Sequence, residues 1–180
     1  MPESGETVRA FVAVLLSEAA AREAERLLER LRPLARCRWV TREQLHITLR
    51  FLGELSLAVV ERVRSAVAAV TVQPFDIELH RAGAFPDLAR PRTLWLGGDR
   101  GASELTALAG RVDDALFEVG IPRNGRPFSP HLTLARSDGS PLPPALMREL
   151  ERVPSIAWRC TGISLMRSRL TPRGAVYTRL

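Results

Sequence analysis

The sequence has few of the residues from which metal sites and disulfide frameworks are built. Its 180 residues include two cysteines and three histidines. Cys37 and Cys160 lie far apart, and neither belongs to a Cys-x-x-Cys pair. Zinc sites need three or four Cys, His or carboxylate ligands, and disulfide-stapled domains are rich in cysteine. We therefore expect neither a bound metal nor a disulfide framework.

Long apolar runs are also missing from the sequence. No stretch reaches the roughly eighteen apolar residues of a membrane span, and the first residues lack the basic and then apolar pattern of a secretory signal. The length suits one domain or two small lobes with a substantial core. We therefore expect a soluble, cytoplasmic protein that does not bind membranes.

Lysine is absent, so all 26 basic side chains are arginines, and the formal net charge is +6. An excess of arginine favours an anionic partner, because the guanidinium group binds phosphate through paired hydrogen bonds. A genome rich in G and C also uses arginine in place of lysine in every protein that it encodes. Both interpretations stay open at this point.

The sequence does contain a duplicated tetrapeptide that holds two of the three histidines. Residues 46–49 are His-Ile-Thr-Leu, and residues 131–134 are His-Leu-Thr-Leu. Their β-branched and aliphatic residues are typical of a half-buried strand. Because side chains alternate between the faces of a strand, the His and Thr of each copy share one face. Each copy therefore predicts a strand that presents an imidazole and a hydroxyl opposite its core side.

Two imidazoles and two hydroxyls are a set of groups that suits in-line displacement at phosphorus. A histidine gives or takes a proton near neutral pH, so two histidines can act as general acid and general base. A threonine hydroxyl can donate a hydrogen bond to a negatively charged oxygen. The sequence alone leaves open which histidine is the acid. A metal site is the alternative, but each copy offers one ligand and no carboxylate.

The duplicated motif resembles the hallmark of the two-histidine phosphoesterase superfamily. Within it, the chain is similar to the LigT/ThpR-type RNA 2′,3′-cyclic phosphodiesterases, formerly called 2′-5′ RNA ligases. The flanking residues match as well, and the resemblance covers nearly the whole chain. The matching blocks are Phe51-Leu52-Gly53 after the first copy, Pro130 before and Ala135-Arg136 after the second, Gly83–Pro86, and Pro91–Gly97.

This resemblance implies a single bilobal domain over residues 1–180, and the spacing of the motifs, close to half the chain, also suggests a duplication. The expected fold is α+β, with two pseudo-symmetric lobes, each a mostly antiparallel sheet with outer helices, and an active-site groove between them. The implied activity is hydrolysis of a terminal 2′,3′-cyclic phosphate to a 2′-phosphomonoester without a cofactor. His46 would be the proton donor and His131 the proton acceptor, while Thr48 and Thr133 would hold phosphate oxygens.

Apolar periodicity and turn residues predict the order of elements along the chain. Strands are expected over residues 8–16, 74–79 and 93–96 and at both motifs, with Gly53 ending the first motif strand. Helices are expected over residues 19–34, 57–70, 103–119 and 146–152, with Ser17 and Ser103 as N-caps. Residues 83–91 are predicted as a loop and 122–130 as a connection, and residues 156–167 and 174–179 as a terminal antiparallel pair.

Three further residues are candidates for substrate binding. Arg136 stands at an odd offset from Thr133, so it shares the catalytic face only if the strand bends; it could contact phosphate or remain an exposed arginine. Arg50 could line the groove or pair with a carboxylate. Phe128 could stack on an unpaired base or anchor a loop. For His80 we expect a structural role, and for Trp95 and Tyr177 core packing.

Other functions use the same groups. The motif chemistry would also serve 2′-5′ RNA ligation or hydrolysis of a small cyclic nucleotide, and a non-catalytic module could use the groove to grip an RNA end. The expected partner is an RNA or oligonucleotide with a 2′,3′-cyclic phosphate end. We expect a monomer without an obligatory protein partner.

Overall fold

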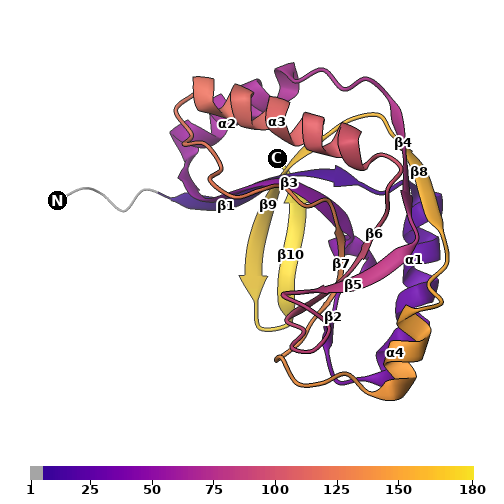
Figure 1. The fold of residues 1–180 in the computed structure, drawn as a ribbon. Helices are drawn as coiled ribbons and strands as arrows, with labels where there is room; N and C mark the ends of the chain where they lie inside the picture. Colours follow the sequence, from indigo (N-terminus) through magenta and orange to yellow (C-terminus); the bar gives the residue numbers. More distant parts are fainter. Residues whose placement is uncertain (1–5) are drawn as a thin grey trace.

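The computed structural model describes residues 6–180, in which antiparallel strands alternate with helices (Figure 1). The strands are β1 (Thr7–Leu15), β2 (Arg38–Trp39), β3 (His46–Ser56), β4 (Phe75–Leu79), β5 (Arg81–Phe85), β6 (Thr93–Gly97), β7 (Leu132–Arg136), β8 (Ile156–Cys160), β9 (Ser164–Thr171) and β10 (Gly174–Arg179). The helices are α1 (Glu18–Leu31), α2 (Leu57–Ala69), α3 (Ala102–Glu118) and α4 (Pro144–Leu150), with short 3₁₀ helices η1 (Arg32–Leu34) and η2 (Arg42–Gln44). None of the helices in this range has the length and apolar character of a membrane span.

Helix α1 forms where the sequence predicts it. The Ser17 side chain accepts a hydrogen bond from the Ala20 amide at 3.2 Å, which satisfies one of the amides that a helix leaves free at its start. The side chains at helical spacing are buried, and the helix contacts β8. The α-helix ends at Leu31, and Pro33 lies in η1, because proline has no amide hydrogen to continue the α-helical ladder.

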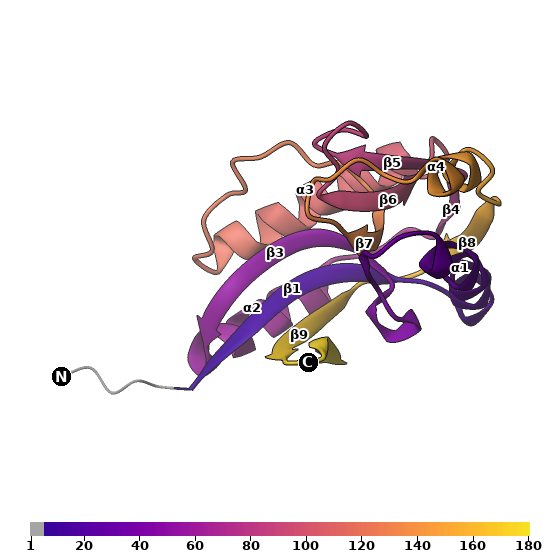
Figure 2. The same cartoon turned by 90° about the horizontal axis from the view of Figure 1, so that it is seen from below.

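The two motif strands are neighbours at the centre of the larger sheet. Its strand order is β10-β9-β1-β3-β7-β6-β5, with β2 paired to β7. Strands β3 and β7 meet through a single backbone pair, Ile47 with Leu132, and then diverge. Lobe one therefore consists of β10-β9-β1-β3 and lobe two of β7-β6-β5 with β2. Figure 2 shows β1 and β3 side by side as a curved layer, with β5 and β6 beyond them.

The two halves of the chain repeat one order of elements and exchange strands. The order β1-α1-β3-α2-β4-β5 corresponds to β6-α3-β7-α4-β8-β9. Strand β5 pairs with β6 of the second half, whereas β9 pairs with β1 of the first. The equivalent strands β4 and β8 pair with each other as a separate two-stranded sheet. The α+β fold with mostly antiparallel lobes is confirmed, and each lobe contains two strands from the other half: β9 and β10 in lobe one, β2 and β5 in lobe two.

The two faces of lobe one pack differently. On one face, the even-numbered residues of β1 from Val8 to Val14 join the main core, which α2 and α3 cover (Figure 1). On the other face, Phe11 and Ala13 form a small cluster with Met166, against which Leu15 and Tyr177 pack. This second face, called the groove face below, carries the smaller apolar cluster and lies opposite the helices.

The prediction that Gly53 ends the first motif strand is wrong, because β3 continues to Ser56. Phe51 pairs with Phe11 and Gly53 with Ala10, so Leu52 has no partner on β1. This extra residue is a β-bulge. Gly53 has a φ of +72°, a left-handed conformation that glycine adopts without steric cost. The glycine therefore marks a bend within the strand.

Three other boundaries also differ from prediction. The segment 83–91 starts as strand rather than loop, since β5 extends to Phe85. The predicted arm 156–167 is two strands: β8 pairs with β4, and only β9 pairs with β10. Alternation of apolar residues indicates a strand but not its partner. Ser103 does not cap α3, whose N-cap is Gly101 with a φ of +84°.

Candidate active site

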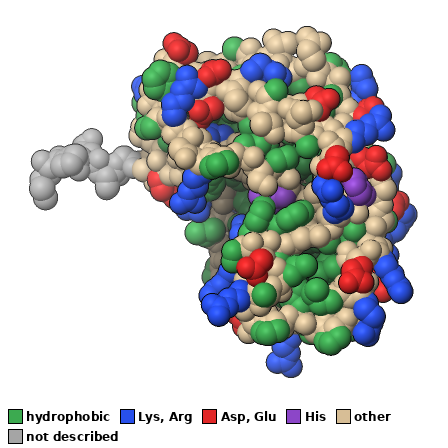
Figure 3. All heavy atoms as spheres, viewed as in Figure 1, with side chains coloured by type: hydrophobic (Ala, Val, Ile, Leu, Met, Phe, Trp, Pro, Cys, Tyr) green, Lys and Arg blue, Asp and Glu red, His purple; other side chains and the backbone are tan. Residues whose placement is uncertain are grey.

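The pairing of Ile47 with Leu132 joins the two motifs at equivalent positions. Both side chains are fully buried in the main core. Because successive side chains point to opposite faces, the His and Thr that flank Ile47, and those that flank Leu132, project to the groove face. All four are half-buried. Figure 3 shows a histidine in a hollow of the surface, with hydrophobic side chains around it.

Two hydrogen bonds fix the imidazole of His46. Its Nδ1 lies 2.8 Å from the Gln44 carbonyl oxygen, and its Nε2 lies 2.9 Å from the Thr48 hydroxyl oxygen. A carbonyl oxygen only accepts, so Nδ1 carries a hydrogen. In the neutral ring Nε2 therefore accepts from Thr48, and in the protonated ring it donates. Nε2 is consequently the atom that exchanges a proton in the groove.

His131 has the equivalent of the first of these two bonds. Its Nδ1 lies 2.7 Å from the Ser129 carbonyl oxygen, which again belongs to the residue two positions before the histidine. Nδ1 therefore donates, and Nε2 remains available in the groove. The duplication thus extends from the residue types to the tautomer that each ring must adopt.

Aromatic side chains enclose both imidazoles. The ring centre of Phe11 lies 4.7 Å from that of His46, and Tyr177 packs against the same imidazole at 5.2 Å with its plane at 88°. Across the groove, Phe85 lies 4.9 Å from His131 at an angle of 86°. Edge-to-face packing of this kind is favourable for aromatic rings. It also removes water from one side of each imidazole.

Burial lowers the pKa of both histidines. For His46, burial is the main cause; the hydrogen bond to Gln44 opposes it, and the charge of His131 lowers the pKa further. For His131, burial again comes first, opposed by the bond to Ser129, and the Arg136 guanidinium lowers its pKa further. The free protein therefore favours neutral rings. A bound phosphate, being negative, favours the protonated form and supplies the charge that an acid needs.

These enclosures can be tested by NMR titration of the histidine ring protons. We expect the pKa values of His46 and His131 to lie below the ordinary value of about 6.5. Tyr177→Ala opens one side of the His46 ring to water, so the pKa of His46 should rise while that of His131 changes little. Phe85→Ala should give the opposite pattern. Equal shifts of both histidines in either variant would contradict two separate enclosures.

Equivalent β-bulges lie at the last residue of each motif. The residue without a cross-strand partner is Leu49 in β3 and Leu134 in β7, in each case the leucine directly after the motif threonine. An inserted residue resets the alternation of faces. The side chain three positions after each threonine therefore returns to the groove face. In β7 this residue is Arg136, and in β3 it is Phe51.

The bulge explains how Arg136 joins the site despite its odd offset. Arg136 pairs with Thr93 and Thr133 pairs with Trp95, so both share the face of one stretch of β6. The Arg136 guanidinium donates to the Thr93 hydroxyl at 2.6 Å. The strand bend that the sequence left open is thus present, and it places a cation beside the second motif.

Arg50 takes the other of its two predicted alternatives and pairs with a carboxylate. The same kind of bulge turns Arg50 to the face of its partner Val12, which belongs to the main core. There its guanidinium lies 3.2 Å from the Asp113 carboxylate of α3, with only 10% of the side chain exposed, and it donates to the Pro122 carbonyl. Arg50 therefore faces α3 and does not line the groove.

The remaining candidates are structural or neighbours of the site. Phe128 packs against the main core and lines a cavity of about 240 Å³ beside Leu49, as a loop anchor would. Trp95 packs across Gly83, where a Cβ would lie 2.3 Å from the indole ring. His80 is exposed, between β4 and β5. Across residues 6–180, no three His, Cys, Asp or Glu side chains are placed to hold a metal ion.

The aromatic residues around the histidines could not be identified from the sequence. Tyr177 was expected in the core, yet it stands half-buried against His46. It arrives there because β10 is tied to the segment before the first motif: the Gln44 side chain donates to the Ala175 carbonyl at 2.7 Å. No local signal indicates such a pairing. The sequence indicates only that Ala175 and Tyr177, two positions apart on a strand, point to the same face.

An antiparallel α+β fold with paired imidazoles on equivalent strands defines the class of two-histidine phosphoesterases. The chain belongs to the 2′-5′ RNA ligase superfamily, whose family model matches residues 17–172. The resemblance stated from the motifs is thereby confirmed.

Similar proteins carry a consistent description. A protein of Aeropyrum pernix named RNA 2′,3′-cyclic phosphodiesterase is 38% identical, covering 77% of this chain and 80% of its own. A protein of the same name from Aquifex aeolicus is 34% identical, covering 95% of this chain and 94% of its own. The solved structure of TT0787 of Thermus thermophilus has a TM-score of 0.78 at 32% identity, covering 96% and 94%. E. coli LigT complexed with 3′-AMP has a TM-score of 0.76 at 27% identity, covering 97% and 96%.

Proposed function

We propose that this chain hydrolyses 2′,3′-cyclic phosphate ends of RNA to 2′-phosphomonoesters by acid–base catalysis with two histidines. The observation that carries the proposal is the matched pair of imidazoles. In each, a carbonyl holds Nδ1 as a donor and leaves Nε2 to exchange a proton in the groove. The relatives named RNA 2′,3′-cyclic phosphodiesterase support the same substrate class.

The two imidazoles divide the proton transfers. His131 Nε2 takes a proton from water as the water oxygen forms a bond to phosphorus. The bond between phosphorus and O3′ breaks, and His46, protonated at Nε2, gives its proton to the departing O3′. The product carries the phosphate on O2′ and a free 3′-hydroxyl. Both rings end with exchanged protonation states, and the next cycle requires proton exchange with water.

The hydroxyls and Arg136 hold the phosphate during this transfer. The Thr48 and Thr133 hydroxyls are neutral donors on the groove face, where non-bridging oxygens would lie. Arg136 adds a positive charge beside the second motif, and a guanidinium is suited to phosphate oxygens. One chain supplies both histidines and both threonines. The site is therefore complete in a monomer.

Removal of metal ions provides a direct test of this mechanism. We expect hydrolysis of a cyclic-phosphate-ended oligonucleotide to proceed at the same rate after exhaustive chelation with EDTA, because two imidazoles supply acid and base without a Lewis acid. The measurement is the initial rate without chelator, with chelator, and after each of several divalent ions is added back in excess of the chelator. A rate that is lost with EDTA and restored only by one divalent ion would contradict the proposal.

A further inference from the structure

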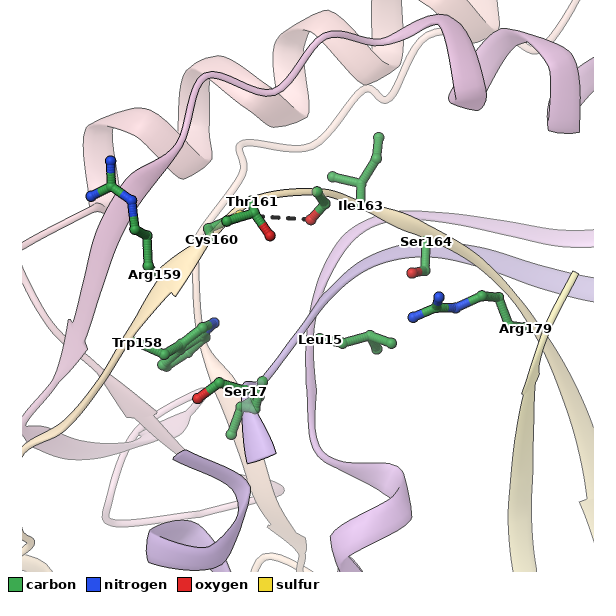
Figure 4. A pocket seen from close by; sticks show the side chains of 11 residues that line it. Leu15, Ser17, Trp158, Arg159, Cys160, Thr161, Ile163, Ser164 and Arg179 are labelled. Atoms are coloured by element: carbon green, nitrogen blue, oxygen red, sulfur yellow. Dashed lines mark hydrogen bonds between the residues drawn. The ribbon is translucent and has the colours of Figure 1, made fainter. Parts of the chain in front are cut away.

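A second cavity, of about 330 Å³, is lined by residues of β1, β8, β9 and β10 (Figure 4). It lies at the end of β1, where Leu15, one of its lining residues, is the cross-strand partner of His46. Cross-strand partners share a face, so the cavity continues the face that carries the first motif. Neither histidine lines it, and the catalytic mechanism above does not use it.

The walls of this cavity have the chemistry of an anion site. Two arginines and three hydroxyl-bearing residues line it, and no carboxylate does. The hydroxyl-bearing residues are Ser17, Thr161 and Ser164. The indole nitrogen of Trp158, also in the wall, is buried and has no hydrogen-bond partner. Such a set of donors, with no carboxylate among the lining residues, matches the oxygens of a phosphate group.

Arg179 is the cation available to a ligand in this cavity. Figure 4 shows its guanidinium pointing inward, between Ser164 and Leu15. Within residues 6–180 it makes no ion pair, whereas Arg159, the other arginine of the wall, is engaged at 3.2 Å by Asp76. An arginine that projects into a cavity without a carboxylate partner keeps its charge available for an anion.

The cavity and the catalytic imidazole lie along one strand face. Tyr177 and Arg179 are two positions apart on β10 and so point to the same side. Tyr177 packs against His46, and Arg179 lies about 7 Å further along the strand. An RNA strand whose end occupies the histidine pair can therefore reach the cavity with a neighbouring phosphate.

We propose that this cavity, with Arg179 as its anchor, binds the phosphodiester that links the terminal nucleotide to the one before it. The inference rests on the proposed function and adds a preference: the protein selects oligonucleotide ends over free nucleoside cyclic phosphates. The terminal cyclic phosphate occupies the histidine pair, and the adjacent backbone phosphate occupies the Arg179 cavity. A mononucleotide lacks this second phosphate and gains nothing from the cavity.

The test compares two substrates in three proteins. The substrates are a nucleoside 2′,3′-cyclic phosphate and a dinucleotide that ends in the same group; the proteins are wild type, Arg179→Gln and Arg169→Gln. Arg169 is the matched control, because it is exposed on the same hairpin but points away from the groove face. Its neighbour Ser168 pairs with Tyr177 on the groove face, and successive residues of a strand point to opposite faces. We expect Arg179→Gln to lower the ratio of kcat/KM for dinucleotide over mononucleotide by about 10-fold, as loss of a charged hydrogen bond does. Arg169→Gln should preserve the ratio.

The salt dependence gives a second readout. The slope of log kcat/KM against log salt for the dinucleotide should become shallower by about 0.7 in Arg179→Gln, as expected when one phosphate contact to a single strand is lost. An unchanged ratio in Arg179→Gln, or an equal fall in Arg169→Gln, would overturn the cavity assignment while mononucleotide hydrolysis still supports the proposed function. A wild-type protein inert on both substrates would overturn the proposed function and this inference together.

Discussion

We expect alanine at His46 or at His131 to slow single-turnover hydrolysis of a cyclic-phosphate-ended RNA by about 10²- to 10⁴-fold, because each change deletes a proton-transfer group. The two losses should not multiply in the double variant, since acid and base act as a unit. Each ring is half-buried and hydrogen-bonded to one backbone carbonyl, so its removal also deletes a structural contact. Circular dichroism is therefore used to check that every variant is folded.

His80→Ala is the matched control for these two substitutions. It removes the third histidine, which is exposed and outside both motifs, and should leave turnover close to that of wild type. A folded His46→Ala or His131→Ala protein with nearly normal turnover would remove the basis for two-histidine catalysis.

Valine at Thr48 or Thr133 should give the second-largest losses, of about 10²- to 10³-fold. Valine keeps the shape of the side chain and deletes a donor to the charged oxygens of the transition state. Thr48→Val also removes the hydrogen bond to His46 Nε2, 2.9 Å long in the free protein. The measurement is again single-turnover hydrolysis, with Thr106→Val on the exposed side of α3 as the control.

The rate of the threonine variants should fall at the chemical step. An oxyanion donor acts in the transition state, so the single-turnover rate at saturating substrate should drop. A change confined to substrate affinity, with the saturated rate preserved, would mean that the two hydroxyls bind the ground state only. That outcome would exclude them from the transition-state role assigned here.

The duplicated motif predicted the centre of the fold because the direction of its side chains depends only on residues within the motif. A strand alternates faces whatever its partners are, so the His and Thr of each copy had to share a side. Ser17 predicted the start of α1 for the same reason, since a cap depends on residues within one turn. The implied bilobal fold then required only that the two copies meet, which they do through Ile47 and Leu132.

Register and strand exchange could not be predicted from the sequence. The bulges at Leu49 and Leu134 decide that Arg136 faces the groove and Arg50 faces α3, yet a bulge depends on the partner strand rather than on the inserted residue. In the same way, the placement of Tyr177 beside His46 depends on β10 being added to lobe one through β9. Such pairings join residues far apart in the chain and leave no periodic signal.

The central claim is tested most directly by identifying the product that the wild-type protein makes. A short RNA ending in a 2′,3′-cyclic phosphate would be incubated with the protein in EDTA, and the phosphate of the product located by phosphorus NMR. The proposed mechanism predicts a 2′-phosphomonoester with a free 3′-hydroxyl, formed at a rate that depends on both His46 and His131. A 3′-phosphomonoester, or an unchanged cyclic end, would contradict the account.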